Sequence, residues 1–316
     1  MSARPSLGDI DALLSDGAAA SLRARPNFRA IVEQLITRSL ANYRTLDAAG
    51  RWMLADIGRS SLYIAAVILD AQPNGVSATL LTAAAQGNQA SSRGRVAQFI
   101  RFAQDAGEIV VPPGSEPWTR RRLTLRPAFV ERLRRRTITD ALVVSLIAEE
   151  LAPLVDSLED DATYRRFLTW IGVLATHDRL VGPPTPVTMF LNRRSGMRIL
   201  YHLTLAQAPD RGRMLEEASI SRNQLSQLYE VSRAHINRLL ADAEAEGLLH
   251  CPTPTRVVFS PALSDAFERT LAFIIQINRA AFVATLATAL EAEPPVQVVA
   301  VANPSDKPRS SSGRQA

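Results

Sequence analysis

The stretch SRNQLSQLYEVSRAHINRLLADAEAEGLL, from Ser221 to Leu249, has the pattern of two helices joined by a short turn. A serine side chain accepts a hydrogen bond from a backbone N–H in the first turn of a helix, so Ser221 and Ser232 can each cap one. Gly247 suits the position just past a helix C-terminus. The second helix has apolar residues at helical spacing: Ile236, Leu239, Leu240 and Ala243. The stretch therefore predicts a helix-turn-helix.

The flanking sequence extends this pattern into a larger unit. Upstream, the apolar residues of 196–207 predict a helix. Downstream, Leu248 and Leu249 begin a strand, residues 251–256 form a turn, and residues 257–259 return as a second strand. Three helices followed by a two-stranded hairpin form the winged helix-turn-helix layout.

A looser copy lies upstream, in SSRGRVAQFIRFAQDAGEIV at residues 91–110. Ser92-Arg93 and Gly107 have the same spacing as Ser232-Arg233 and Gly247. We expect its helices at 62–70, 78–85 and 93–106, and a wing with strands at 109–111 and 118–125.

The repeated features continue on both sides of the two copies. Trp52-Met53-Leu54 precedes Arg59-Ser60, and Thr188-Met189-Phe190 precedes Arg194-Ser195. A Pro-Ala pair begins a helix after each wing, and long apolar helices over 139–151 and 271–290 are expected after that. Periodicity on this scale is typical of internal duplication.

The predicted fold is therefore mostly α with small β-wings, in tandem winged helix-turn-helix domains related by internal duplication. The first half covers 26–151 and the second half 152–291. Residues 1–25 lack periodicity and residues 292–316 are rich in Pro and Ser, so we expect both ends to be disordered.

The duplicated unit resembles the winged helix-turn-helix regulators of bacteria. The helix pair and its spacing in 221–249 are similar to those of the catabolite-activator group, and the wing followed by a long helix is similar to the MarR group. The sequence departs from these families at Glu230, where they often place glycine or asparagine in the turn. The resemblance implies that residues after the cap of the third helix face DNA bases.

The predicted DNA-binding residues form two groups. Arginine can donate two hydrogen bonds to guanine, so the outer faces of the two third helices are expected to contact bases. This group contains Arg93, Arg95 and Gln98 in the first half, and Ser232, Arg233, His235, Asn237 and Arg238 in the second. Arg120, Arg122 and Arg256, in the wings, are expected to contact phosphates. Arg120 and Arg122 would share one side of the strand at 118–125, because neighbours on a strand alternate faces.

Composition narrows the function classes. The 316-residue chain has a net charge of +5, which suits a polyanionic partner, and 36 basic residues of which only Lys307 is lysine. The single cysteine excludes an internal disulfide and fits a reducing cytoplasm. The chain has no catalytic triad pattern, phosphate-binding glycine loop or paired cysteines for zinc. We therefore expect no enzymatic activity, cofactor or metal.

Two further segments have alternative interpretations. Residues 271–290 are long enough to cross a bilayer, but they contain Gln276, Asn278 and Arg279, so we expect a packing helix and no membrane partner. Four side chains could line an effector pocket between the halves or belong to the core: Tyr164, Phe167, Trp170 and Leu174.

These observations predict a cytoplasmic, nucleoid-associated, sequence-specific transcriptional regulator that binds double-stranded DNA. It would act as a pseudo-dimeric monomer or as a homodimer. Its two third helices would enter successive major-groove faces about 34 Å apart. Three alternatives stay open: a plasmid-type replication initiator on repeated sites, a protein-interaction scaffold that does not bind DNA, and a repressor that senses an unidentified small-molecule effector.

Overall fold

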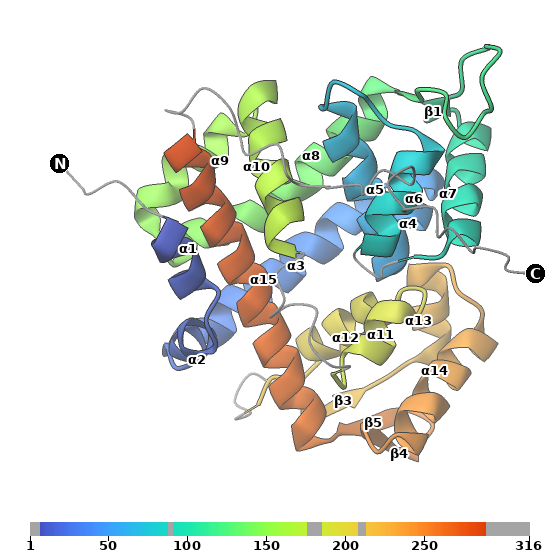
Figure 1. The fold of residues 1–316 in the computed structure, drawn as a ribbon. Coiled ribbons are helices and arrows are strands. Elements are labelled where there is room, and N and C mark those ends of the chain that lie inside the picture. The colour runs from blue at the N-terminus through green and yellow to red at the C-terminus, as the bar shows by residue number, and fades with distance from the viewer. Residues whose placement is uncertain (1–6, 88–90, 176–184, 208–212, 289–316) are drawn as a thin grey trace, which may run out of the picture.

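The computed structural model describes residues 7–87, 91–175, 185–207 and 213–288. It is mostly α-helical, with 68% helix and two small antiparallel sheets, which confirms the expected composition of the fold. Figure 1 shows the long C-terminal helix crossing the molecule, with the strands of both sheets to its right in this view.

The second head, residues 196–259, has the predicted helices and a wing, but its strands extend into the turn expected at 251–256, which covers only residues 254 and 255. Its sheet has the order β3-β5-β4, so an additional strand, β3, pairs with the returning strand of the wing. The sequence did not predict this strand, which is three residues long. The elements are α12 (Gly196–Leu205), β3 (Glu217–Ser219), α13 (Arg222–Tyr229), α14 (Arg233–Ala245), β4 (Leu249–Thr253) and β5 (Arg256–Phe259).

The first head, residues 57–125, repeats this order with much less sheet. An isolated bridge between Val76 and Leu123 takes the place of the β3–β5 pairing. The elements are α5 (Ile57–Asp70), α6 (Ala78–Gly87), α7 (Arg93–Asp105), β1 (Ile109–Val110) and β2 (Thr124–Leu125). The two heads thus share an arrangement of elements, while their origin by duplication remains a prediction.

Helices α7 and α14 begin and end with matching hydrogen bonds. Ser92 Oγ accepts from the N–H of Arg95 at 3.4 Å, and Ser232 Oγ accepts from the N–H of His235 at 3.1 Å. Gly107 and Gly247 each follow the C-cap residue of their helix, with φ of 70° and 67°, a conformation that glycine adopts without a steric penalty. The N–H groups of these glycines and of the residues after them bond back to the last turn. The predicted caps are confirmed.

The two heads differ in the helices that come after the wing. After the second head, α15 (Pro261–Thr288) runs as one 28-residue helix. After the first head, α8 (Pro127–Ala141) ends early, and the helix expected at 139–151 is wrong. Two 3₁₀ turns, Val144–Leu146 and Glu149–Leu151, lie there before the short α9 (Ala152–Ser157). Pro153 lies in the first turn of α9, where its missing N–H costs no hydrogen bond.

The N-terminal segment is helical where the sequence predicted disorder. It forms α1 (Leu7–Leu13) and α2 (Asp16–Arg23), the second capped by Ser15, and both pack on α15. Arg23 also pairs with Asp265 and Glu268 of α15. Helices of seven and eight residues are too short to show a clear period, and tertiary packing stabilises them. Residues 292–316 lie outside the described residues.

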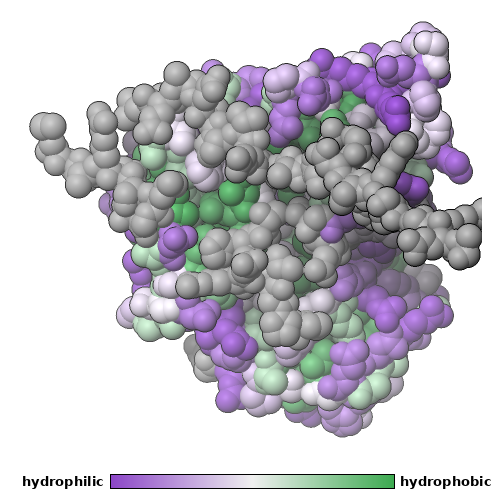
Figure 2. Space-filling model, in the orientation of Figure 1, coloured by the Kyte–Doolittle hydropathy of each residue, from purple (hydrophilic) through white to green (hydrophobic). Residues whose placement is uncertain are grey.

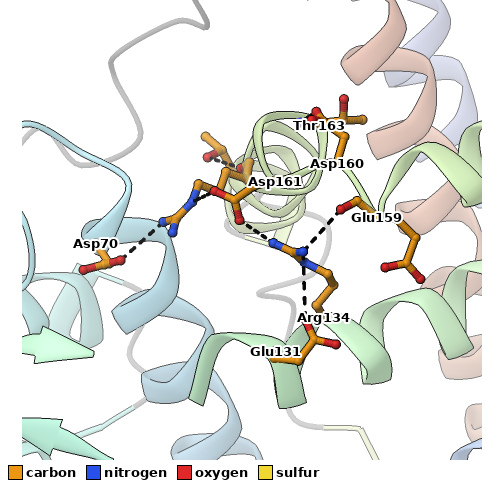
Figure 3. A network of polar contacts seen from close by, with 9 residues as sticks. Asp70, Glu131, Arg134, Glu159, Asp160, Asp161 and Thr163 are labelled. Atoms are coloured by element: carbon orange, nitrogen blue, oxygen red, sulfur yellow. Dashed lines mark hydrogen bonds and ion pairs between the residues drawn. The ribbon is translucent and has the colours of Figure 1, made fainter. Parts of the chain in front are cut away.

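Helix α10 (Asp161–Ala175) connects the two heads. It packs against α5 of the first head and α15 beyond the second. Figure 3 shows the ion pairs at its start, where Asp161 binds Arg134 of α8 and Arg165, and Arg165 reaches Asp70 at 3.3 Å. One cluster of buried side chains includes residues of both heads. The division near residue 151 therefore remains a prediction.

The aromatic residues of α10 belong to the core. Phe167 packs on Phe282 of α15 with ring centroids 4.5 Å apart, and the Trp170 indole N–H donates to Thr288 at 3.3 Å. Tyr164 and Leu174 are buried as well. Of the two interpretations of these four side chains, the one that places them in the core is confirmed.

Helix α15 is long and apolar enough, by composition, to cross a membrane. Half of its most apolar window is buried inside the protein. It packs against α1, α2, α8 and α10, as the expected packing helix would. The remaining helices, α3 (Phe28–Thr45), α4 (Ala48–Met53) and α11 (Thr188–Asn192), complete the fold around it.

Candidate nucleic-acid interface

The outer face of α14 presents arginines to solvent. Its inner face is buried, as the sequence spacing predicts. Arg233 and Arg238 are exposed, and no hydrogen bond or ion pair engages either side chain in the part of the chain that the structure describes. Because these guanidinium groups have no partner among the described residues, both are available to an external acceptor.

Three other predicted residues of α14 have contacts within the protein. The Ser232 hydroxyl caps the helix. The His235 ring contacts the carbonyl oxygen of Arg194 at 2.9 Å, so it is half-buried and fixed at the helix start. Asn237 accepts a hydrogen bond from Arg222 of α13 at 3.1 Å. These contacts hold the helix in position. An atom that makes one of them would have to give it up before it could contact a DNA base.

The outer face of α7 is similar. Arg93, Arg95 and Gln98 are all exposed, and no side-chain partner for them occurs within the described ranges. Arg101, one turn further along, is also exposed and unpaired there. Both third helices therefore present unpaired guanidinium groups, which is the arrangement that the sequence predicts.

The wing of the first head departs from the prediction. Residues 118–120 form a turn, and only residues 124–125 form the returning strand, so the expected strand at 118–125 is wrong. The Arg120 N–H bonds to Pro117, and the Thr119 carbonyl accepts from Thr79 of α6, so this backbone does not pair with β1. The alternation that placed Arg120 and Arg122 on one side does not apply. Both side chains are nevertheless exposed.

In the second wing, Arg256 already has a partner. Its guanidinium donates two hydrogen bonds to the Glu217 carboxylate, at 2.6 and 2.8 Å. This pair joins β5 to β3 on the sheet surface. A phosphate contact by Arg256 would have to displace that carboxylate, whereas Arg120 has no such competitor among the described residues.

Between the heads lies Arg59, which the sequence marked only as part of a repeated pattern. Trp52 stacks on Phe102 of α7 with centroids 3.8 Å apart, and the Arg59 guanidinium lies 4.1 Å from the Trp52 centroid. Burial lowers the pKa of Arg59, nearby Asp56 opposes this, and the charges of Arg194 and Arg95 lower it further. The positive charges of Arg95, at the start of α7, and of Arg194 thus act on the Arg59 guanidinium.

Arg194 in turn contacts the first turn of α14 through His235. We call Arg59, Arg95 and Arg194 the basic junction: the charges of Arg95 and Arg194 act on Arg59, Arg95 lies at the start of α7, and the backbone of Arg194 contacts the first turn of α14. Figure 2 shows hydrophilic residues along the side of the molecule where both heads lie. In the sequence, Arg59 follows Trp52-Met53-Leu54 and Arg194 follows Thr188-Met189-Phe190. This repeated pattern was the only signal in the sequence that could have identified the two arginines.

The turn residue Glu230 connects the second head to α4, the helix before the first head. It ends α13 in the left-handed region, with φ of 51° and ψ of 43°, where a non-glycine residue is strained. Its carboxylate pairs with Arg51 of α4 at 2.9 Å. The unusual glutamate thus has a local role, because glycine or asparagine could not form this ion pair.

The described residues contain no group of three or more His, Cys, Asp or Glu side chains placed to hold a metal ion. Cys251 is half-buried on β4, and its neighbour His250 pairs with Glu244 at 2.6 Å. Comparison of the chain with protein-family models, with curated proteins and with solved structures found no match.

Proposed function

We propose that the chain is a sequence-specific DNA-binding transcriptional regulator of the winged helix-turn-helix type, and that both heads contact one double-stranded DNA. The observation that carries this proposal is the exposed face of α14, where Arg233 and Arg238 have no partner among the described residues. Arginines at the start of such a helix can read guanine, and the helix is held by caps and a three-stranded sheet.

The basic junction supports a shared DNA site. The exposed arginines of α7 and α14 and the three arginines of the basic junction add positive charge to the two heads. Concentrated positive charge attracts the phosphate backbone and gives a strongly salt-dependent affinity. A shared site replaces our sequence-based expectation of two separate groove contacts about 34 Å apart. In this proposal the chain acts without a catalytic site, in the cytoplasm on the nucleoid.

Selection of sheared genomic DNA, followed by mobility shifts on the enriched fragments, tests the proposal. Arg233→Ala and Arg238→Ala should weaken binding and relax sequence preference, while Arg135→Ala should not. Arg135 is the matched control because it is an exposed arginine on α8, paired with Glu131. Enriched fragments with direct repeats and local melting would favour a replication initiator instead. No binding at low salt would reject the proposal and favour the interaction scaffold.

A further inference from the structure

A cavity of about 160 Å³ lies where the two heads meet the central helices. Its walls come from α3, α5, α8, α12 and α15 and from the residues around α11. The lining is largely apolar, and it includes Leu35, Leu54, Met197 and Ile274. An apolar cavity of about 150 Å³ can take up benzene, so this one has room for a ligand of that size.

The polar part of the lining carries excess positive charge. Arg136, Arg193 and Arg198 face two carboxylates, those of Asp56 and Asp140. Arg193 is already paired with Asp242 of α14 at 2.6 Å, and Asp56 with Arg59 at 3.4 Å. Asp140 is 3.7 Å from Arg136. Arg198 is thus left without a carboxylate in salt-bridge contact among the described residues.

Arg136 and Arg198 line the polar part of the cavity, and one of them, Arg136, has a buried nitrogen without a hydrogen-bond partner in the described structure. Arg198 lies over the Tyr43 ring at 4.1 Å, and burial lowers its pKa to about 10. The Nη1 atom of Arg136 is buried, and no hydrogen-bond acceptor contacts it in the described structure. A buried donor without a partner destabilises the protein, and a charged donor does so more strongly. An anion in the cavity would offset the charge of Arg198, and it would reach Arg136 Nη1 only with a shift of that side chain, because the atom is closed off from solvent.

We infer that this cavity binds a small organic anion: a monocarboxylate whose apolar body is about the size of a benzene ring. The carboxylate binds Arg136 and Arg198, and the body packs among the leucine, methionine and isoleucine side chains. Ser39 and Asn42 of α3, which also line the cavity, supply further hydrogen-bonding groups.

The cavity adjoins the DNA-facing surface at two points. Arg193 connects its wall to α14 through Asp242, and Asp56 connects it to Arg59 of the basic junction. A ligand in the cavity can therefore change the positions of the DNA-facing arginines. That effect rests on the proposed function, but occupancy itself does not, so binding is measured on the protein without DNA.

The test is calorimetric titration of the whole chain with three probes: benzoate, benzyl alcohol as a neutral ligand with the same ring, and acetate as an anion without one. Benzoate should bind, and the other two should bind at least about ten-fold more weakly, because each lacks one of the two recognised features. Equal binding of benzyl alcohol, or no heat with benzoate into the millimolar range, would overturn the inference.

Variants locate the binding. Arg198→Met keeps the length of the buried side chain without its charge, and Arg136→Gln keeps a polar group. Each should weaken benzoate by about ten-fold or more while the melting transition stays cooperative. Arg38→Met is the control, since Arg38 is exposed on α3 next to Ser39 but does not line the cavity. Unchanged benzoate affinity in the pocket variants that fold, whether both or only one, would contradict the assignment.

Discussion

The two heads have nearly the same helix termini but different sheets. Helices α7 and α14 both begin at a capping serine and end before a glycine with positive φ. The second head adds a three-stranded sheet, while the first has two strands of two residues and one bridge. The comparison teaches that the helix, with its local caps, is specified by short sequence signals, whereas the rigidity of its support depends on pairing between distant segments.

This difference predicts unequal roles in DNA binding. Helix α14 is held by the more extensive sheet, so it is the better placed to read bases. Arg233→Ala and Arg238→Ala should each cost about 1–3 kcal/mol of discrimination at one base pair. Arg93→Ala and Arg95→Ala should lower affinity with less effect on preference. Competition mobility shifts with single-base variants of a selected site measure both the affinity and the sequence preference. An equal loss of preference from substitutions in the two heads would contradict the prediction that their roles differ.

The matched helix ends predict matched stability effects. Gly107→Ala and Gly247→Ala place a Cβ at positive φ, although nothing lies within 4 Å of either added atom. Each should destabilise the protein by about 1–2 kcal/mol through backbone strain alone. Urea denaturation compares them. If one of the two substitutions left the free energy of unfolding unchanged, the two helix ends would differ in a way that their backbone angles do not reveal.

The capping serines sharpen the same comparison. Ser92→Ala and Ser232→Ala should each cost about 1 kcal/mol, since each removes an acceptor for an N–H of the first turn. The shorter bond at Ser232, 3.1 Å against 3.4 Å, predicts the larger loss there. Denaturant midpoints provide the measurement, with Ser219→Ala, an exposed serine of β3, as the control. A larger loss at Ser92 would reverse the ranking.

The wings should differ in salt dependence. Arg120 is exposed without a side-chain partner among the described residues, and Arg256 is bound to Glu217. Arg120→Ala should therefore reduce the slope of log affinity against log salt by about one unit. Arg256→Ala should change that slope less. Fluorescence anisotropy over a salt series measures both, and the opposite order would show that Arg256 exchanges Glu217 for a phosphate.

The smallest effect is expected at Glu230. Glycine at this position would relieve the left-handed strain, about 1–2 kcal/mol, but would remove the ion pair with Arg51, which at this exposure contributes at most about 1 kcal/mol. Glu230→Gly should thus raise stability slightly. Arg51→Ala should lower it slightly. Thermal melts of both variants decide the sign, and destabilisation by glycine would mean that the ion pair outweighs the strain.

Local signals in the sequence predicted the helices and their ends well. Ser92, Ser232, Gly107 and Gly247 act on their own neighbours, so their spacing was enough. Strand β3 and the bridge at Val76 were missed because two or three residues carry no period, and only pairing across the fold defines them.

The site was predicted in part. The exposed faces of α7 and α14 agreed with helical spacing, whereas the return strand over 118–125 failed because hydrogen bonds to α6 replaced the strand pairing. Arg59 and the cavity around Arg198 are formed by residues far apart in the chain. Their proximity depends on how α3, α5, α8 and α12 pack, which no single stretch of sequence encodes.

The central claim is that the two heads share one DNA site, and binding to a short duplex tests it most directly. A duplex of about 12 base pairs, cut from a selected fragment, spans about 40 Å, which is too short to fill two half-sites one helical turn apart. Anisotropy titrations should show that Arg95→Ala in the first head and Arg233→Ala in the second both weaken binding to this duplex. If only one of the two variants weakened it, the heads would act on separate sites and the account would be contradicted.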